Sequence, residues 1–175
     1  MNAFTVVLAL VIAQRLVELA HARANTRRLL ARGAVEVGAS HYTLFVVLHA
    51  AWLLSLAAVV PWDAEPRPVP LAAFGVLMLA RIWIMASLGS FWTTRILTLP
   101  GAPLVRRGPY RWIRHPNYWV VAGELALLPL AFDALGVAVV FSTLNGALLA
   151  WRVAVEDRAL APRRLSVRGS SAASG

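Results

Sequence analysis

The chain has 175 residues, of which 59% are hydrophobic and only 14% are charged, and its mean hydropathy is +0.67. Soluble domains are about half apolar and a quarter charged, so this composition excludes an ordinary soluble domain and favours one bundle of membrane-spanning helices. All 17 basic residues are arginines. They lie beside apolar runs, which fits the positive-inside bias and excludes a nucleic-acid-binding face. The lack of cysteine excludes disulfides, zinc-thiolate sites and thiol nucleophiles.

The first predicted helix begins in the apolar run 3–13, and its pattern continues through residues 14–19 into a basic segment that stops at Gly33, a C-cap residue type. Arg15 and Glu18 are three residues apart and share one face of this helix. Two interpretations stay open for them. They are a functional pair at membrane depth, or an interfacial pair whose side chains reach towards water.

The second predicted span covers residues 41–60 and the third covers 71–88. The second contains two histidines, but no HxxxH or ExxH pair, so no metal site is predicted. The third contains Arg81, which costs about 2.5–3.5 kcal/mol near the bilayer centre and must face the bundle interior, an aqueous cavity or an interface. Trp83 and Trp92 are of the residue type that forms aromatic belts at the interface.

A long polar connection, residues 90–116, follows the third span. Its piece RILTLPGAPLV has two short β-prone runs about a Pro-Gly turn dipeptide, which predicts a small hairpin or an irregular cap. Two short apolar helices, 118–132 and 135–151, then form a hairpin. They carry the polar residues Glu124 and Asn145, which need partners in lipid and are expected to hydrogen-bond between helices.

These spans predict an all-α integral membrane protein with about five transmembrane helices, the last two a short hairpin. Arginine counts along the chain are four in 21–40, one in 61–70, five in 90–116 and five from 152 onward. This alternation places the N-terminus outside and the C-terminus in the cytosol. We expect three parts: membrane helices with a basic loop over 1–89, a core with a cytosolic pocket over 90–165, and a disordered tail over 166–175.

The densest polar segment, RRGPYRWIRHPNY, covers residues 106–118. Pro116 prevents a helix from continuing through His115 and suits the first position of the fourth helix, whose exposed N–H groups favour an anion. Arg152 and Glu156, four residues apart, project from one face of the last helix. Either these arginines only anchor helices at the interface, or the two segments form the walls of one site.

The order of these residues resembles the isoprenylcysteine carboxyl methyltransferase family. The C-terminal half of that family pairs a G-x-Y-x-W-x-R-H-P-x-Y segment with an R-x-x-x-E-[ED]-x-x-L segment. Here the first pattern matches residues 108–118, and the second matches Arg152, Glu156, Asp157 and Leu160. The resemblance covers residues 95–160, and the first three spans match mainly by layout. Two departures, Ala102 where the eukaryotic enzymes have histidine and aspartate as the second acid, separate the chain from those enzymes.

The resemblance implies S-adenosyl-L-methionine as the methyl donor. It implies a catalytic role for Arg152, which would orient the substrate oxygen. If the substrate is a phenol, its proton must be removed, and His115 is the side chain best placed by type to do this, although its main expected role is to bind the cofactor. It also implies a set of residues that would bind the cofactor: Leu104, Val105, Tyr110, His115, Pro116, Asn117, Tyr118 and Glu156.

The amino-acid sequence of the motifs is similar to that of a bacterial branch of the family, some members of which O-methylate phenolic or pyrone lipids. The expected partners are therefore a lipophilic small molecule and membrane lipids, in a bacterial inner or plasma membrane, with no nucleic acid. The methyl acceptor would be a carboxyl, enol or phenol oxygen. The alternatives are a prenylcysteine carboxyl methyltransferase and, in another class, a small membrane transporter or scaffold subunit.

Overall fold

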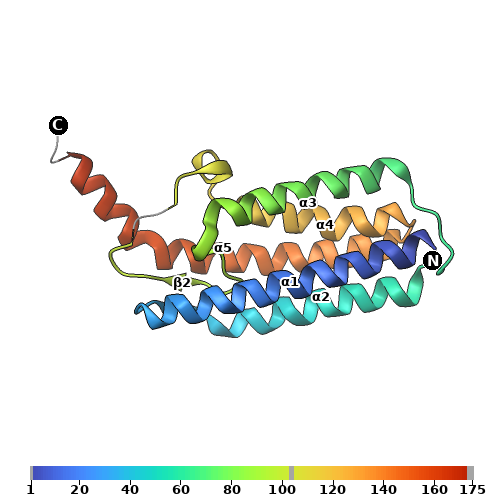
Figure 1. The fold of residues 1–175 in the computed structure, drawn as a ribbon, viewed down its shortest axis with the longest axis horizontal. Helices are drawn as coiled ribbons and strands as arrows, with labels where there is room; N and C mark the ends of the chain where they lie inside the picture. The colour runs from blue at the N-terminus through green and yellow to red at the C-terminus, as the bar shows by residue number, and fades with distance from the viewer. Residues whose placement is uncertain (1, 103–104, 173–175) are drawn as a thin grey trace.

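The computed structural model describes residues 2–102 and 105–172, with the side chains of all of these except 40, 41 and 160–172. Five helices lie side by side along the long axis of the molecule (Figure 1). The predicted all-α architecture is confirmed. The helices are α1 (Ala3–Ala31), α2 (Ala39–Val59), α3 (Pro68–Leu88), α4 (Pro116–Ala131) and α5 (Leu135–Ala172).

The bundle has the length and apolarity of a membrane domain. Within the described residues, α1, α2, α3 and the part of α5 over Leu135–Ala159 are long and apolar enough to cross a membrane. Helix α4 has 16 residues and rises about 24 Å, less than the ~30 Å hydrocarbon core. It packs between α3 and α5, while α5 also contacts α2, and α2 contacts α1. The predicted hairpin of α4 and α5 is present, and α4 is short as predicted, whereas α5 is not.

Two helix ends are closed by the same backbone motif. After α1, the N–H of Ala34 donates to Leu29 O and that of Gly33 to Leu30 O, both at 3.0 Å. Gly33 has φ +87°, so this is the Schellman arrangement, and the predicted cap at Gly33 is confirmed. After α4, Asp133 takes the same left-handed position with φ +57°. Its carboxylate forms an ion pair with Arg67, in which Oδ1 lies 2.6 Å from Nε. Arg67 directly precedes α3, so this ion pair connects the turn between α4 and α5 to the start of α3.

The small β element has a partner that the sequence does not predict. Strand β2 (Leu97–Thr98) pairs antiparallel with β1 (Val35–Glu36), the segment that follows α1. The Pro100-Gly101 turn is present, with Gly101 at φ +74° and a 3.2 Å bond from Ala102 N to Leu99 O. The second β-prone run of the predicted hairpin includes residues 103–104, which lie outside the described part of the chain.

Helix α5 is longer than predicted. Residues 166–172, expected as part of a disordered tail, continue the helix in the structure. Once a helix is nucleated, each added residue contributes one further hydrogen bond, and the preceding alanines, arginines and leucines are good helix formers. Residues 173–175 lie outside the described part of the chain.

Four charged side chains form a buried charge cluster in the middle of the bundle. Arg81 donates to Glu124 through Nε at 2.8 Å and through Nη2, and reaches Glu18 at 3.3 Å. Arg15 pairs with Glu124 at 2.5 Å and with Glu18 at 3.3 Å. Two guanidinium groups and two carboxylates balance in charge and join α1, α3 and α4. Arg15 and Glu18 thus belong to an interior network and do not form an isolated interfacial pair that reaches towards water.

Candidate active site

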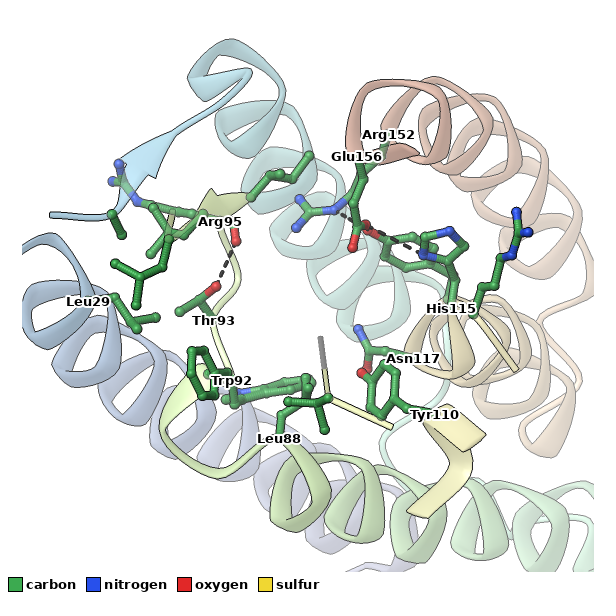
Figure 2. Close-up of a pocket in the computed structure, with 18 of the residues that line it drawn as sticks. Leu29, Leu88, Trp92, Thr93, Arg95, Tyr110, His115, Asn117, Arg152 and Glu156 are labelled. Atoms are coloured by element: carbon green, nitrogen blue, oxygen red, sulfur yellow. Dashed lines mark hydrogen bonds and ion pairs between the residues drawn. The ribbon is translucent and has the colours of Figure 1, made fainter. Parts of the chain in front are cut away.

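A cavity of about 310 Å³ lies at the end of the bundle where α3 and α1 end and α4 begins (Figure 2). Its volume falls at the lower end of the range for small-molecule sites. One side of it is largely apolar and the other carries most of the polar groups. The lining includes Leu29, Leu88, Phe91, Trp92, Thr93, Arg95, Leu97, Leu99, Val105, Arg106, Tyr110, Arg114, His115, Asn117, Tyr118, Arg152 and Glu156.

The segment before α4 is held against α3 by a glycine. The 3-10 turn η2 (Gly108–Arg111) begins at Gly108, which has φ +56°. A Cβ atom there would lie 2.0 Å from Ser87 Oγ. The neighbouring Arg107 Nε donates to Ser87 O at 2.7 Å, so the chain crosses the end of α3 at backbone contact distance. Only glycine fits this crossing, which places Tyr110 on the cavity wall.

Replacing Gly108 by alanine is therefore expected to detach η2 from α3 and to lower the thermal stability of the purified protein. The left-handed backbone alone costs a side chain about 1–2 kcal/mol, and the clash with Ser87 adds to this. Gly75→Ala is the matched control, because a Cβ atom at Gly75 meets nothing within 4 Å. Melting in detergent should separate the two variants, and equal melting temperatures would contradict this account of Gly108.

The two sequence motifs meet through Tyr118. Its hydroxyl donates to Glu156 Oε2 and accepts a 2.8 Å hydrogen bond from Arg152 Nε. Arg152 Nη2 donates to Thr94 O at 2.9 Å. Figure 2 shows the side chains of Arg152 and Glu156 directed from α5 into the cavity. The start of α4 and the last helix thus form one polar wall, as the sequence predicts.

His115 lies between two carboxylates at the edge of this wall. Its Nδ1 is 3.6 Å from Glu156 Oε2, and its Nε2 is 3.3 Å from Asp157 Oδ1. The imidazole stacks on the Tyr118 ring with centroids 5.2 Å apart and an interplanar angle of 12°. Both ring nitrogens therefore face acids. This arrangement holds Glu156 in place and gives the imidazole two carboxylates to which it can pass a proton.

Two further polar groups line the cavity beside the start of α4. Burial, and secondly the negative charge of Glu156, raise the pKa of the Tyr110 phenol above its ordinary value of 10.0. Tyr110 is therefore a neutral hydrogen-bond donor at physiological pH. Asn117 Oδ1 is buried and has no hydrogen-bond partner among the described residues. A buried acceptor without a partner is costly, so Asn117 is suited to receive a donor from a ligand.

The apolar wall comes from segments that carry no motif. Asn25 on α1 donates to Gly89 O at 3.1 Å and to Trp92 O at 2.9 Å, which fixes the 3-10 turn η1 (Gly89–Phe91) and the residues after it. Trp92 is 4% exposed and lines the cavity. Its predicted place in an aromatic belt is wrong, because η1 turns the chain inward there. Trp83, on α3, is 52% exposed and consistent with the belt.

The structure brings most of the predicted site residues to one cavity. Pro116 is buried at the first turn of α4 and supports the wall without lining it. Leu104 lies outside the described residues. None of the buried charge cluster lines the cavity, and neither does Asn145. The residues that do line it are Val105, Tyr110, His115, Asn117, Tyr118, Arg152 and Glu156.

Sequence reasoning missed Arg95. This side chain lines the cavity and is held by Glu36, whose two oxygens lie 2.8 and 3.0 Å from Arg95 Nη1. Its guanidinium also lies over the Tyr42 ring at 4.7 Å. No local pattern could have indicated this role, because Glu36 and Tyr42 are more than fifty residues away in sequence.

Fold and site together define a helical membrane protein with a ligand-sized cavity at one end of its bundle. The model of the isoprenylcysteine carboxyl methyltransferase (ICMT) family matches residues 70–162, which include both segments that form the polar wall of the cavity. The chain belongs to this family, and the family's enzymes are methyltransferases.

Two relatives match nearly the whole chain. An uncharacterized protein of Bacillus subtilis, YpbQ, is 40% identical over 161 residues, covering 90% of this chain and 96% of the relative. An uncharacterized protein of Haemophilus influenzae is 26% identical over 161 residues, covering 87% and 91%. No solved structure matches.

Proposed function

We propose that the protein is an S-adenosyl-L-methionine-dependent O-methyltransferase that acts on a lipophilic substrate at the membrane surface. The observation that carries the proposal is the single polar wall formed by Tyr118, Arg152 and Glu156 inside a cavity with an opposite apolar wall. In the proposed orientation this end of the bundle faces the cytosol, in agreement with the arginine counts. A water-soluble cofactor and a lipid-soluble acceptor can meet there.

The chemistry of the cavity fits the cofactor. Its donor and acceptor groups include the Glu156 carboxylate and the unpartnered Asn117 Oδ1, which suit an ammonium group. Arg95, which also lines the cavity, suits a carboxylate. The apolar wall around Leu88 and Trp92 offers surface for a ring system. When bound, the cofactor supplies an electrophilic methyl group on a sulfonium centre.

The residues of the chain would act mainly by positioning. Near-attack geometry requires the acceptor oxygen about 3–3.5 Å from the methyl carbon. Arg152 is fixed by Tyr118 and Thr94, so its remaining nitrogen can hold an acceptor oxygen in one place. A carboxylate or enolate acceptor needs no base. A phenol must lose a proton, and His115 would pass it to Asp157 or Glu156, which lie on its two nitrogens.

Tyr118→Phe tests the link between the start of α4 and α5 within the polar wall. The variant keeps the ring stacked on His115 but removes the hydroxyl that joins Glu156 and Arg152. Both hydrogen bonds of the hydroxyl are lost, but neither is made to the cofactor itself, so we expect cofactor affinity to fall only about 5- to 10-fold, with the fold retained. Equilibrium binding of labelled cofactor and circular dichroism measure the two quantities. Unchanged affinity would show that Tyr118 does not organise the site.

The acceptor is tested by methyl transfer from labelled cofactor to a panel of alkylpyrones, alkylresorcinols and prenylcysteines, with the full chain in bilayers. The proposal expects label on a pyrone or phenolic lipid, because the chain resembles that bacterial branch. Arg152→Ala should abolish transfer while the protein still binds the cofactor. Label on prenylcysteine alone would replace the expected acceptor with the alternative one, and label on none of the acceptors would count against the proposed substrate class.

A further inference from the structure

Residues 106–114 form an exposed basic surface next to the cavity. Arg106, Arg111 and Arg114 are exposed, and so are Trp112 and Ile113 between them, with Trp112 at 70%. The whole connection 90–116 contains no aspartate or glutamate. Arg106 and Arg114 also line the cavity, so the basic surface continues into its mouth.

The basic surface projects sideways from the bundle. Figure 1 shows this segment, in yellow, standing off the flank of the bundle beside the ends of α3 and α4. The Gly108 crossing and the bond from Arg107 to Ser87 O fix it there. A segment that extends laterally at the level where membrane helices end lies along the bilayer surface. Trp83 and Trp119, exposed about one turn inside the adjoining helix ends, mark the interfacial depth.

The charges of the basic surface have no ion-pair partner in the part of the chain that the structure describes. Within the described residues, no carboxylate forms an ion pair with Arg106, Arg111 or Arg114, although Arg67 and Arg95 elsewhere in the chain each have one. Unpaired arginines at a membrane surface attract anionic lipids, and the planar guanidinium matches the geometry of phosphate oxygens. An exposed tryptophan and isoleucine between them add apolar anchors for the same surface.

We propose that the basic surface binds the phosphate headgroups of anionic phospholipids at the mouth of the cavity. This inference goes beyond the proposed function and does not depend on it, because it requires only that the helices span a bilayer. It also differs from a role in topology alone, which requires positive charge during insertion but no preference for anionic headgroups in the folded protein.

Trp112 provides the reporter for a direct test. The full chain is reconstituted in phosphatidylcholine bilayers containing an equal fraction of brominated phosphatidylglycerol or brominated phosphatidylcholine. Trp112 emission is taken as the difference between the wild type and Trp112→Phe. We expect stronger quenching by the brominated anionic lipid, and we expect the excess to decrease with rising salt. Each arginine replaced by glutamine should weaken the preference about fivefold.

The matched control is a triple replacement on α1. Arg23, Arg27 and Arg28 are exposed, and the end of α1 extends further along the bundle axis than the yellow segment (Figure 1). Their replacement by glutamine should leave quenching of Trp112 unchanged, whereas Arg106→Gln with Arg111→Gln and Arg114→Gln should remove the preference. If the triple variant misfolds, the same quenching measurement is made with Arg111→Gln alone, because Arg111 does not line the cavity. Equal quenching by both lipids, or equal loss in the α1 control, overturns the proposal.

Discussion

Replacing Glu156 by glutamine is expected to weaken binding of S-adenosyl-L-methionine about 10- to 100-fold. The carboxylate accepts a hydrogen bond from the Tyr118 hydroxyl and faces His115, and it supplies negative charge to a cavity whose lining also includes four arginines. A hydrogen bond to a charged group contributes about 1.5–3 kcal/mol, and an amide keeps the shape of the side chain without its charge. Calorimetric titration of the detergent-purified protein measures the change.

Glu65→Gln is the control for this substitution. Glu65 is an exposed carboxylate in the loop before α3, at the opposite end of the bundle. Its loss changes the net charge of the protein by the same amount without touching the cavity. If Glu156→Gln binds as tightly as Glu65→Gln, then the wall of the cavity that contains Tyr118 and Glu156 does not hold the cofactor.

Replacing Arg81 by methionine is expected to destabilise the bundle by about 3–5 kcal/mol. Arg81 is 3% exposed and holds both Glu124 and Glu18. Its removal leaves two carboxylates and one guanidinium in the bundle interior, and an uncompensated buried charge is strongly unfavourable. Unfolding of the purified protein in mixed micelles by increasing denaturing detergent gives the change in the free energy of unfolding.

Two further variants separate charge imbalance from lost packing. Arg81→Met combined with Glu124→Met restores neutrality, because Arg15 and Glu18 remain as a pair. We expect the double variant to be more stable than the single one, a coupling that a double-mutant cycle quantifies. Arg67→Met breaks an ion pair whose side chains are 64% and 65% exposed, so it should cost less than about 1 kcal/mol. A double variant that is less stable than Arg81→Met would contradict the account of the cluster.

The parts of the fold that depend on local signals could be predicted from the sequence. Gly33 ends α1 and Pro116 begins α4 because left-handed caps and first-turn prolines are properties of a few neighbouring residues. The two segments that form the polar wall of the cavity were predictable for a related reason. Each segment is a short run of residues, and their order along the chain resembles the motifs of one family.

The parts that depend on distant contacts could not be predicted. Strand β2 pairs with residues about sixty positions earlier, a partner that its local pattern does not indicate. The sequence indicates that Arg81 needs a partner, but it does not show whether this side chain faces the bundle interior, a cavity or the interface. Its partners Glu124 and Glu18 lie on other helices, so no local pattern identifies them. The residue type of Trp92 suggests a place in an interfacial aromatic belt, and nothing in the neighbouring sequence indicates that η1 turns the chain towards the bundle interior.

The central claim is that the start of α4 and the last helix build one cofactor site. The most direct measurement is equilibrium binding of labelled S-adenosyl-L-methionine, and of its demethylated product, to the detergent-purified full chain, with the fold monitored by circular dichroism and melting. The account predicts one saturable site per chain, weakened by Glu156→Gln and retained in Glu65→Gln. Folded wild-type protein that binds neither compound would contradict it.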